Sequence, residues 1–414
     1  MYIWKWTCIV LVTKGELSII ESKRNKEKKR LKEIMDKIYK PYYNLFFIAL
    51  FIAVLGILMI TSATYTESGL FYVSRQVTFI LIGILFIITG AHIDIVKWLY
   101  KSSKLLYVLC ILLLILLVTP LGVSSHGATR WLRVPFIQLQ PVELAKLAII
   151  VLLSAFIYRK NRYCKSVKFT LYCWLFGLIP AFLTLKISSD LSSALVILVI
   201  TFGITLIFNR TKKLHIVILL IAVVAIVGYI LHIKSNLPDQ MQINDYSYRI
   251  ARIVGWLYPD RYPDAAYQSQ NALYSIGSGG LLGVGIGKMQ VNVPEGHTDF
   301  IFVILTHQLG IFGGICLILC YVYLLFQILR IAMDAVSLYE TVLVIGILLH
   351  IATQIIVNIG VCTSLLPNTG LPLPLVSYGG SSVLVNFAEL AICVTVSKKS
   401  VIKASKKIAK EELK

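Results

Sequence analysis

Long apolar runs separated by short polar segments dominate this chain from residue 44 onward. A helix needs about 20 apolar residues to cross a hydrocarbon layer of about 30 Å, and runs of this length predict membrane-spanning helices. Ten runs qualify, although the fourth is short and contains Glu143 and Lys146. The predicted spans lie near residues 44–62, 73–91, 105–120, 143–158, 169–186, 190–208, 214–233, 300–330, 341–362 and 379–397.

The composition supports the same class. Hydrophobic residues make up 57% of the chain, charged residues 14%, and the mean hydropathy is +0.80. Soluble domains contain about 25% charged and about 45–50% apolar residues, so the chain lies on the membrane side of both. We therefore predict an all-α polytopic membrane protein with about ten transmembrane helices.

The positive charge of the chain is arranged as a topology signal. The formal net charge is +20, but no aromatic-basic module typical of nucleic-acid binding accompanies it. Every second segment between spans is basic, which the positive-inside rule assigns to the cytoplasm, together with both termini. The basic segments lie at residues 23–40, 97–104, 159–168, 210–213 and 398–414.

Three regions follow from this topology. Residues 1–42 form a basic cytoplasmic segment, 43–397 the membrane domain, and 398–414 a basic cytoplasmic tail that faces anionic lipid. No function is assigned to residues 1–40, because the first twelve lack the basic start and cleavage site of a signal peptide. Met35 is an alternative translation start.

The predicted topology places three longer segments on the extracytoplasmic side, at residues 121–142, 234–299 and 363–378. Loops longer than about 15 residues are usually functional or disordered. The loop 234–299, between the seventh and eighth spans, is rich in aromatic residues, so we expect it to fold onto the outer membrane surface. Its aromatic residues include Trp256, Tyr258, Tyr262, Tyr267 and Tyr274.

Asp299 is the most informative single residue. It lies between the polar loop and an apolar run, in the sequence His297-Thr298-Asp299-Phe300-Ile301-Phe302. An acid at this border is costly to desolvate and is usually kept for chemistry or for binding a cation.

Several cationic residues lie on the side that the topology rule normally keeps poor in them. Guanidinium groups suit bidentate phosphate binding, so this set predicts a site for an anionic head group such as a phosphorylated lipid. Surface ion pairs with Asp245, Asp260 and Asp264 explain it equally well. The set comprises Arg130, Arg133, Arg249, Arg252, Arg261 and Lys288.

Glu143 and Lys146 are three residues apart on one predicted helix and can pair. Asp190 begins the sixth span on the same side and could join them. A buried cluster of this kind typically lines a hydrated pathway. A structural pair that fixes helix packing is at least as good an explanation from these residues alone.

Neither the glycines nor the cysteines indicate a cofactor. The stretch Gly277-Ser278-Gly279-Gly280 lacks the strand and βαβ context of a nucleotide-binding loop. The eight cysteines contain no CxxC pair, so neither a zinc site nor a disulfide framework is expected.

Several blocks together resemble the SEDS family (shape, elongation, division and sporulation). The resemblance runs from about residue 43 to 397. It rests on Arg130-Trp131-Leu132, on Gln140-Pro141-Val142-Glu143-Leu144-Ala145-Lys146, on Ile276 to Gly283, on Pro294 to Phe302, and on Pro372-Leu373-Pro374-Leu375-Val376-Ser377-Tyr378-Gly379-Gly380-Ser381-Ser382.

The resemblance implies a bacterial peptidoglycan glycosyltransferase of the cytoplasmic membrane. Such an enzyme polymerises lipid II on the outer face and works with a class B penicillin-binding protein, the crosslinking transpeptidase, and with other divisome or elongasome membrane proteins. Asp299 matches the essential acid. No cofactor is certain, and a divalent cation (Mg or Mn) is an alternative to the arginines. The implied substrate-binding residues are Arg130, Trp131, Glu143, Lys146, Asp190, Arg249, Arg252, His297, Ser377 and Tyr378.

The chain departs from the family pattern at several positions. Ser188-Ser189-Asp190-Leu191-Ser192 stands where many members read Gln-Pro-Asp-Leu-Gly, and His307-Gln308 where Glu-Glu is frequent. The start of the second span at Arg75-Gln76 and the pattern from Tyr248 to Arg252 favour the FtsW/SpoVE type. The variant Leu375-Val376-Ser377 favours the RodA type, and we prefer the first.

Two other functions are compatible with the same residues. A lipid II flippase would use Glu143, Lys146 and Asp190 as its path, although the two halves of the chain show no internal symmetry of the kind common in transporters. A non-catalytic scaffold would only activate a penicillin-binding protein.

Overall fold

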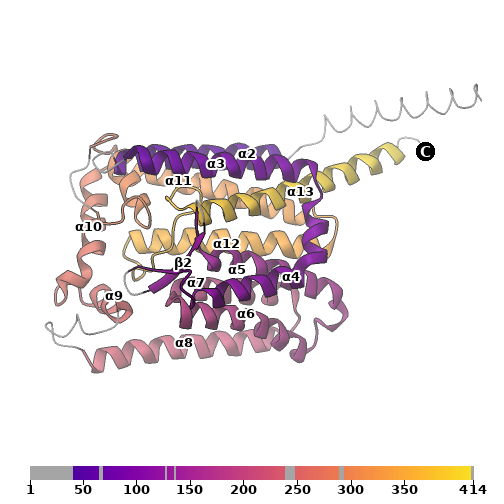
Figure 1. Cartoon of the computed structure of the whole chain (residues 1–414), viewed down its shortest axis with the longest axis horizontal. Helices are drawn as coiled ribbons and strands as arrows, with labels where there is room; N and C mark the ends of the chain where they lie inside the picture. The colour runs from indigo at the N-terminus through magenta and orange to yellow at the C-terminus, as the bar shows by residue number, and fades with distance from the viewer. Residues whose placement is uncertain are drawn as a thin grey trace, which may run out of the picture.

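The computed structural model describes residues 41–64, 69–125, 128–134, 137–237, 248–288 and 293–411. The predicted N-terminal segment with its alternative start, Asp245 and the last three residues lie outside this described part of the chain. The described part is almost entirely helical (Figure 1).

The elements follow the predicted order. The helices are α2 (Pro41–Ala63), α3 (Gly69–His92), α4 (Ile95–Leu116), α5 (Pro141–Arg159), α6 (Val167–Ile187), α7 (Leu191–Phe208), α8 (Lys212–Ser235), α9 (Tyr248–Leu257), α10 (Pro263–Gly279), α11 (Ile301–Met333), α12 (Leu338–Cys362) and α13 (Gly380–Glu411), with a single 3₁₀ turn at Asn161–Tyr163. A small antiparallel sheet contains β1 (Gly122–Ser125), β2 (Ala128–Val134) and β3 (Ile137–Leu139).

Ten of the described helices are long and apolar enough to cross a membrane, which confirms the predicted all-α polytopic class. The third span begins at Ile95, ten residues earlier than predicted, because the side chain of Asp94 accepts a hydrogen bond from the Lys97 N–H and caps the helix. The last helix continues past residue 397 to Glu411.

The bundle has a buried centre and a lipid-facing periphery. About four-fifths of the α5 and α13 spans are buried inside the protein (78% and 83%), whereas only 6% of the α8 span is. The fourth predicted span, which the charges of Glu143 and Lys146 made the least regular in sequence, is therefore a central helix. Its charges are tolerated because neighbouring helices cover them.

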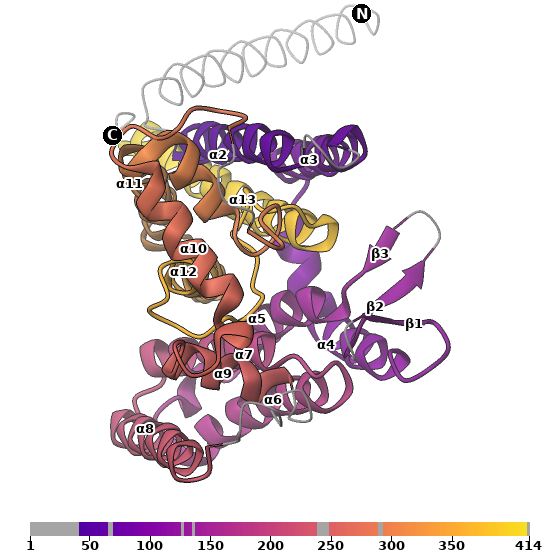
Figure 2. The ribbon, with the colours of Figure 1, turned by 90° about the vertical axis from the view of Figure 1, so that its left-hand side faces the viewer.

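One end of the bundle carries the extra elements. Figure 2 looks onto this end and shows α9 and α10 lying across the ends of the spans, with the small sheet to one side. The loop 234–299 therefore contains two helices in its described part. Two side-chain bonds attach these helices to the loop 363–379: Trp256 Nε1 donates to Ser364 O at 2.8 Å, and Asn368 Nδ2 to Gln268 Oε1 at 2.8 Å.

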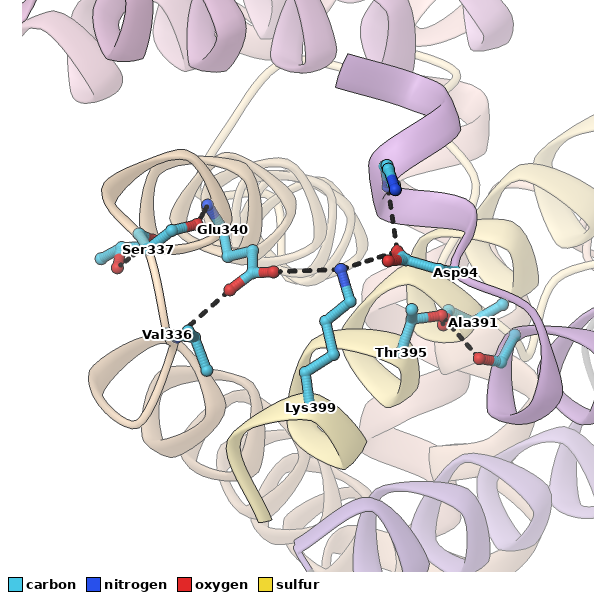
Figure 3. A network of polar contacts seen from close by, with 10 residues as sticks. Asp94, Val336, Ser337, Glu340, Ala391, Thr395 and Lys399 are labelled. Atoms are coloured by element: carbon cyan, nitrogen blue, oxygen red, sulfur yellow. Dashed lines mark hydrogen bonds and ion pairs between the residues drawn. The ribbon is translucent and has the colours of Figure 1, made fainter. Parts of the chain in front are cut away.

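The opposite end is held by a charged network (Figure 3). The ammonium of Lys399 on α13 lies 2.6 Å from a carboxylate oxygen of Asp94 and 3.2 Å from one of Glu340. These two acids precede α4 and begin α12. A single lysine therefore joins three elements where the helices leave the apolar layer.

Helix α11 is broken at Gly310, which has φ 70° and ψ −175°. Residues 280–287, which follow α10 and which we call the glycine loop, pack their backbone into this break. Gly285 N donates to Gln308 O at 3.1 Å, and Ile311 N donates to Gly280 O at 3.0 Å. Irregular backbone inside a membrane is tolerated where protein satisfies its polar groups. Gly283 allows this close approach, because a Cβ atom there would lie 2.1 Å from Gln308 O.

Candidate functional site

Asp299 lies in the turn that precedes α11, on the side of the bundle where Arg252 of α9 is found. Phe300 and Ile301, the next two residues, are completely buried and draw the turn against the bundle. The main-chain carbonyl of Asp299 accepts a hydrogen bond from Asn358 Nδ2 at 2.7 Å. The aspartate is thus held between α11 and α12, and its side chain is partly exposed.

Arg252 and Asp299 both lie beside Gly370. A Cβ atom at Gly370 would lie 3.3 Å from Asp299 Oδ2 and 3.6 Å from Arg252 Nη1. The guanidinium also donates to Asn368 O at 3.3 Å. With φ 74°, Gly370 adopts a backbone conformation that favours glycine, so any side chain here would be strained and would enter the site.

The charge of Asp299 is set by opposing influences. Burial is the largest and raises the pKa of its carboxyl from 3.8 to about 6. Arg252 and Arg130 oppose this rise, whereas Glu295 and Asp190 add to it. A carboxyl with a pKa near 6 is ionised at neutral pH and is a better proton acceptor than an ordinary aspartate.

A cluster of aromatic rings flanks the same turn. The His297 ring lies 4.9 Å from the Tyr72 ring and 5.9 Å from the Tyr378 ring, measured between centroids. Ser377 Oγ donates to Thr298 O at 2.6 Å and accepts from Leu373 N at 2.8 Å. The block around Ser377 and Tyr378 is therefore bonded to the turn that carries Asp299.

Glu143 and Lys146 form the predicted pair, with Lys146 Nζ 2.6 Å from Glu143 Oε1 and both side chains buried. Asp190 instead caps α7, where its side chain accepts a hydrogen bond from Ser193 N at 3.0 Å. Its negative charge raises the pKa of Asp299. The pair and Asp190 thus have different partners in the described structure.

The departure at Ser189 has a structural consequence. This residue has φ 51°, which a proline cannot adopt because its ring fixes φ near −65°. The backbone before Asp190 therefore differs from that of a Gln-Pro-Asp sequence.

The predicted cationic set divides into separate groups. Arg130 Nε is buried and has no hydrogen-bond partner among the described residues. The positive charge of Arg130 lowers the pKa of Asp299. Arg133 is exposed, and the Arg261 guanidinium lies 5.5 Å from the centroid of the Tyr262 ring. Arg130 and Arg252 are the two cations of this set whose charges lower the pKa of Asp299. Trp131 lies beside Arg130 on β2, opposite Val123, whereas the side chain of Arg249 lies outside the described part.

The described residues contain no group of three or more His, Cys, Asp or Glu side chains that could hold a metal ion. Mg²⁺ is often held by one or two carboxylates together with substrate phosphates, an arrangement that needs no such group.

Sequence reasoning missed three residues of the site. Asn358 binds the carbonyls of Asp299 and Leu371, Gly370 leaves room between Asp299 and Arg252, and Tyr72 contacts the His297 ring. A buried asparagine in an apolar span is the one signal in the sequence that could have identified Asn358.

The comparisons with known proteins agree with this architecture. The family model described as "Cell cycle protein" (FtsW/RodA/SpoVE) matches residues 42–402. Stage V sporulation protein E of Bacillus subtilis (strain 168) is 33% identical over 87% of this chain and 98% of its own length. A probable peptidoglycan glycosyltransferase FtsW of Francisella salina is 31% identical over 92% and 94%.

Two solved structures share the fold. A chain of a peptidoglycan synthase complex, described as coordinating polymerization and crosslinking, has a TM-score of 0.72 and 26% identity over 86% of this chain and 98% of its own. The rod shape determining protein RodA of Thermus thermophilus has a TM-score of 0.62 and 26% identity over 86% and 96%. The chain belongs to the FtsW/RodA/SpoVE family of cell cycle proteins, which is the predicted SEDS family.

Proposed function

We propose that this protein is a peptidoglycan glycosyltransferase that polymerises lipid II into glycan strands during division, sporulation or elongation. The observation that carries the proposal is the placement of both Asp299 and Arg252 beside Gly370, in a partly exposed turn where the carboxyl has a pKa of about 6. Relatives named as probable peptidoglycan glycosyltransferases support it.

Asp299 has the properties of a general base. In this proposal it accepts the proton of the 4-hydroxyl of the acceptor's N-acetylglucosamine, and that oxygen attacks the anomeric carbon of the donor's N-acetylmuramic acid. Attack from the face opposite the leaving group inverts the α-linked donor to a β-1,4 product. A positioned base typically contributes about 10²–10⁴-fold in rate.

The leaving undecaprenyl pyrophosphate needs positive charge around it. Arg252 and Arg130 provide two guanidinium groups whose charges already act on Asp299. Fixed cations aimed at a developing negative charge are among the strongest contributors to catalysis. In the proposal these arginines, with Arg249 as a third candidate, hold the pyrophosphate, while Trp131, His297 and Tyr378 contact the sugars.

The substrate sets the orientation that we propose. Lipid II is polymerised outside the cytoplasmic membrane, so the end with α9 and α10 faces outward and both termini lie in the cytoplasm. The basic residues at the opposite end support this orientation, as the positive-inside rule requires. A cysteine in place of Asp264 should react with a membrane-impermeant maleimide in intact cells, and one in place of Lys403 only after permeabilisation. The reverse pattern would overturn the orientation.

A transpeptidase partner belongs to the same proposal. The similar chain in the peptidoglycan synthase complex is described together with crosslinking. We propose that a class B penicillin-binding protein crosslinks the strands that this chain makes, alongside other divisome or elongasome proteins.

The direct test is polymerisation of labelled lipid II by purified protein with its partner, scored as glycan strands on a gel. Asp299→Ala should abolish polymer while the protein stays folded. Asp264→Asn is the matched control, since this exposed carboxylate lies in the first turn of α10; it should polymerise normally. Normal polymer from Asp299→Ala would reject the proposed chemistry.

The same assay separates the rival functions. A flippase predicts that Glu143 and Lys146 are essential and that Asp299 tolerates substitution. A scaffold predicts that none of the three matters as long as the partner is still bound and activated.

A further inference from the structure

Three central helices direct six polar side chains toward one buried seam. Two come from each helix, at spacings of three or four residues that place both on the same helix face. We call this set the polar seam; it comprises Glu143 and Lys146 on α5, His350 and Gln354 on α12, and Asn386 and Glu389 on α13.

Two side-chain contacts fix how α12 and α13 align. His350 Nδ1 lies 2.7 Å from Glu389 Oε1, and Lys399 Nζ lies 3.2 Å from Glu340 Oε1. Glu340 and His350 are ten residues apart on α12, as are Glu389 and Lys399 on α13. The helices therefore run antiparallel at a constant register. One turn further toward the α9–α10 end, this register places Gln354 level with Asn386.

Helix α5 closes the third side of the seam. A Cβ atom at Gly346 of α12 would lie 2.5 Å from Ile150 Cγ2 of α5. Ile150 is four residues beyond Lys146, and Gly346 four before His350, so the register of this antiparallel pair brings Lys146 level with His350. The Gln140 N–H donates to Ser381 Oγ at 3.0 Å, so α5 and α13 start together and Lys146 lies within about one helical turn of Asn386 along the bundle.

All six side chains are buried, and protein groups satisfy them only in part. The structure gives one bond within α5, from Lys146 to Glu143, and one between helices, from His350 to Glu389. Seven buried atoms of the seam have no hydrogen-bond partner among the described residues. They are Glu143 Oε2, His350 Nε2, both amide atoms of Gln354, both amide atoms of Asn386, and Glu389 Oε2.

The chemistry of these seven atoms identifies the occupant. Carboxylate and amide oxygens accept hydrogen bonds, and amide nitrogens donate them. A metal cation would leave the two amide NH₂ groups unsatisfied and would be repelled by the Lys146 ammonium. An anion would be repelled by Glu143 and Glu389. Water both donates and accepts, and it is the usual partner of polar groups buried among helices.

We propose that the polar seam is an intramembrane water-binding site that extends from the Glu143–Lys146 pair to the His350–Glu389 pair. Its water molecules hydrate the Glu143–Lys146 pair inside the bundle. Gln354 and Asn386 hold this water between the two pairs. The site is independent of the proposed glycosyl transfer, because it rests only on burial, register and unsatisfied atoms.

Hydroxyl-radical labelling of the full-length protein in H₂¹⁸O tests the site without any activity assay. Radicals made from bound water oxidise the side chains that it touches, and mass spectrometry reads the ¹⁸O. His350 should be labelled several-fold faster than His215, the matched control. His215 is equally buried, but the protein occupies both of its ring nitrogens, through Thr211 O at 2.9 Å and Thr205 Oγ1 at 3.0 Å. Equal, low labelling of the two histidines would overturn the proposal.

Asn386→Leu gives a second readout, through thermal unfolding. In a hydrated seam the leucine displaces water, so His350 labelling falls and the unfolding temperature drops. In a dry seam the same change removes two unsatisfied atoms and raises the unfolding temperature, which would contradict the proposal. Leu390→Met, at a buried apolar position on α13, should leave His350 labelling unchanged. Labelling that falls when Na⁺ replaces choline would show that a cation fills the site, and would also overturn it.

Discussion

The side-chain amide of Asn358 donates one hydrogen bond to the carbonyl of Asp299 at 2.7 Å and another to the carbonyl of Leu371 at 2.8 Å. One residue of α12 thereby fixes both the turn that carries Asp299 and the loop that carries Gly370. The carboxylate and the loop beside it are positioned together, from the rigid side of the bundle.

Asn358→Leu should therefore impair turnover more than substrate binding. The variant removes both hydrogen bonds. The Leu371 carbonyl loses the donor that Asn358 supplies, and the Asp299 carbonyl keeps only the weak Cys362 Sγ donor at 3.6 Å; a buried carbonyl left unsatisfied costs about 1–3 kcal/mol. We expect kcat for polymerisation to fall by about tenfold or more, as misplacement of a catalytic group predicts, with a smaller change in KM. A rise in KM alone would show that Asn358 acts on binding and not on Asp299.

Asp299→Asn should stabilise the protein while inactivating it. The folded-state pKa of about 6 exceeds the ordinary 3.8, so the folded state binds the proton more tightly than the unfolded state. Ionised Asp299 therefore destabilises the fold, and this effect is complete above about pH 6 and absent below about pH 4. Allowing for the partial exposure of the side chain, we expect the variant to gain about 1–2 kcal/mol at pH 7.5. Denaturant unfolding at pH 7.5 and pH 4 measures it; equal stability of the two proteins at pH 7.5 would contradict the origin assigned to the pKa.

The pH dependence of polymerisation should move in opposite directions in two variants. The rate should fall as the pH drops through about 6, where Asp299 becomes protonated. Arg252→Gln removes a cation that lowers this pKa, so the acid limb of the rate profile should shift to higher pH. Glu295→Gln removes an anion that raises it, so the limb should shift to lower pH. Arg252→Lys keeps the charge and should move the limb less than Arg252→Gln does. Shifts in the same direction would exclude Asp299 as the titrating group.

Gly310→Ala should destabilise the protein strongly. A Cβ atom here would lie 2.2 Å from Leu281 O, at a φ of 70° that favours glycine. Relief of this clash would break the contact between α11 and the glycine loop, so we expect a loss of about 3 kcal/mol or more. Gly228→Ala is the matched control, because no atom lies within 4 Å of a Cβ there. It should be neutral or slightly stabilising in a thermal unfolding assay.

Chelation should leave the fold intact. The described residues contain no group of three or more His, Cys, Asp or Glu side chains that could hold a metal ion, so we expect EDTA not to change the unfolding temperature. If a divalent cation arrives with the substrate pyrophosphate, EDTA should lower polymerisation, and Mg²⁺ or Mn²⁺ should restore it. A drop in unfolding temperature on chelation would reveal a structural metal that we do not expect.

The amino-acid sequence determined the membrane class, the ten spans and the residue at the centre of the site. Apolar runs longer than the hydrocarbon layer leave few alternatives to a helix, because every backbone polar group in lipid must bond within its own segment. A lone acid such as Asp299 at the end of such a run is likewise conspicuous. The spacing of Glu143 and Lys146 also predicted their pair, since residues three apart on a helix are neighbours.

Only the tertiary structure decided which distant residues meet. The sequence favoured no particular partner for Asp299, yet Arg252, Asn358 and Gly370 surround it, because helix packing and loop register set contacts between residues 47–71 positions apart. The break at Gly310 was hidden within an apolar run, since a glycine looks alike in a straight and in a broken helix. His350 and Glu389 also became partners only when α12 and α13 packed antiparallel. Local periodicity specifies a helix and its apolar face, but the alignment of helices depends on the packing of the whole bundle.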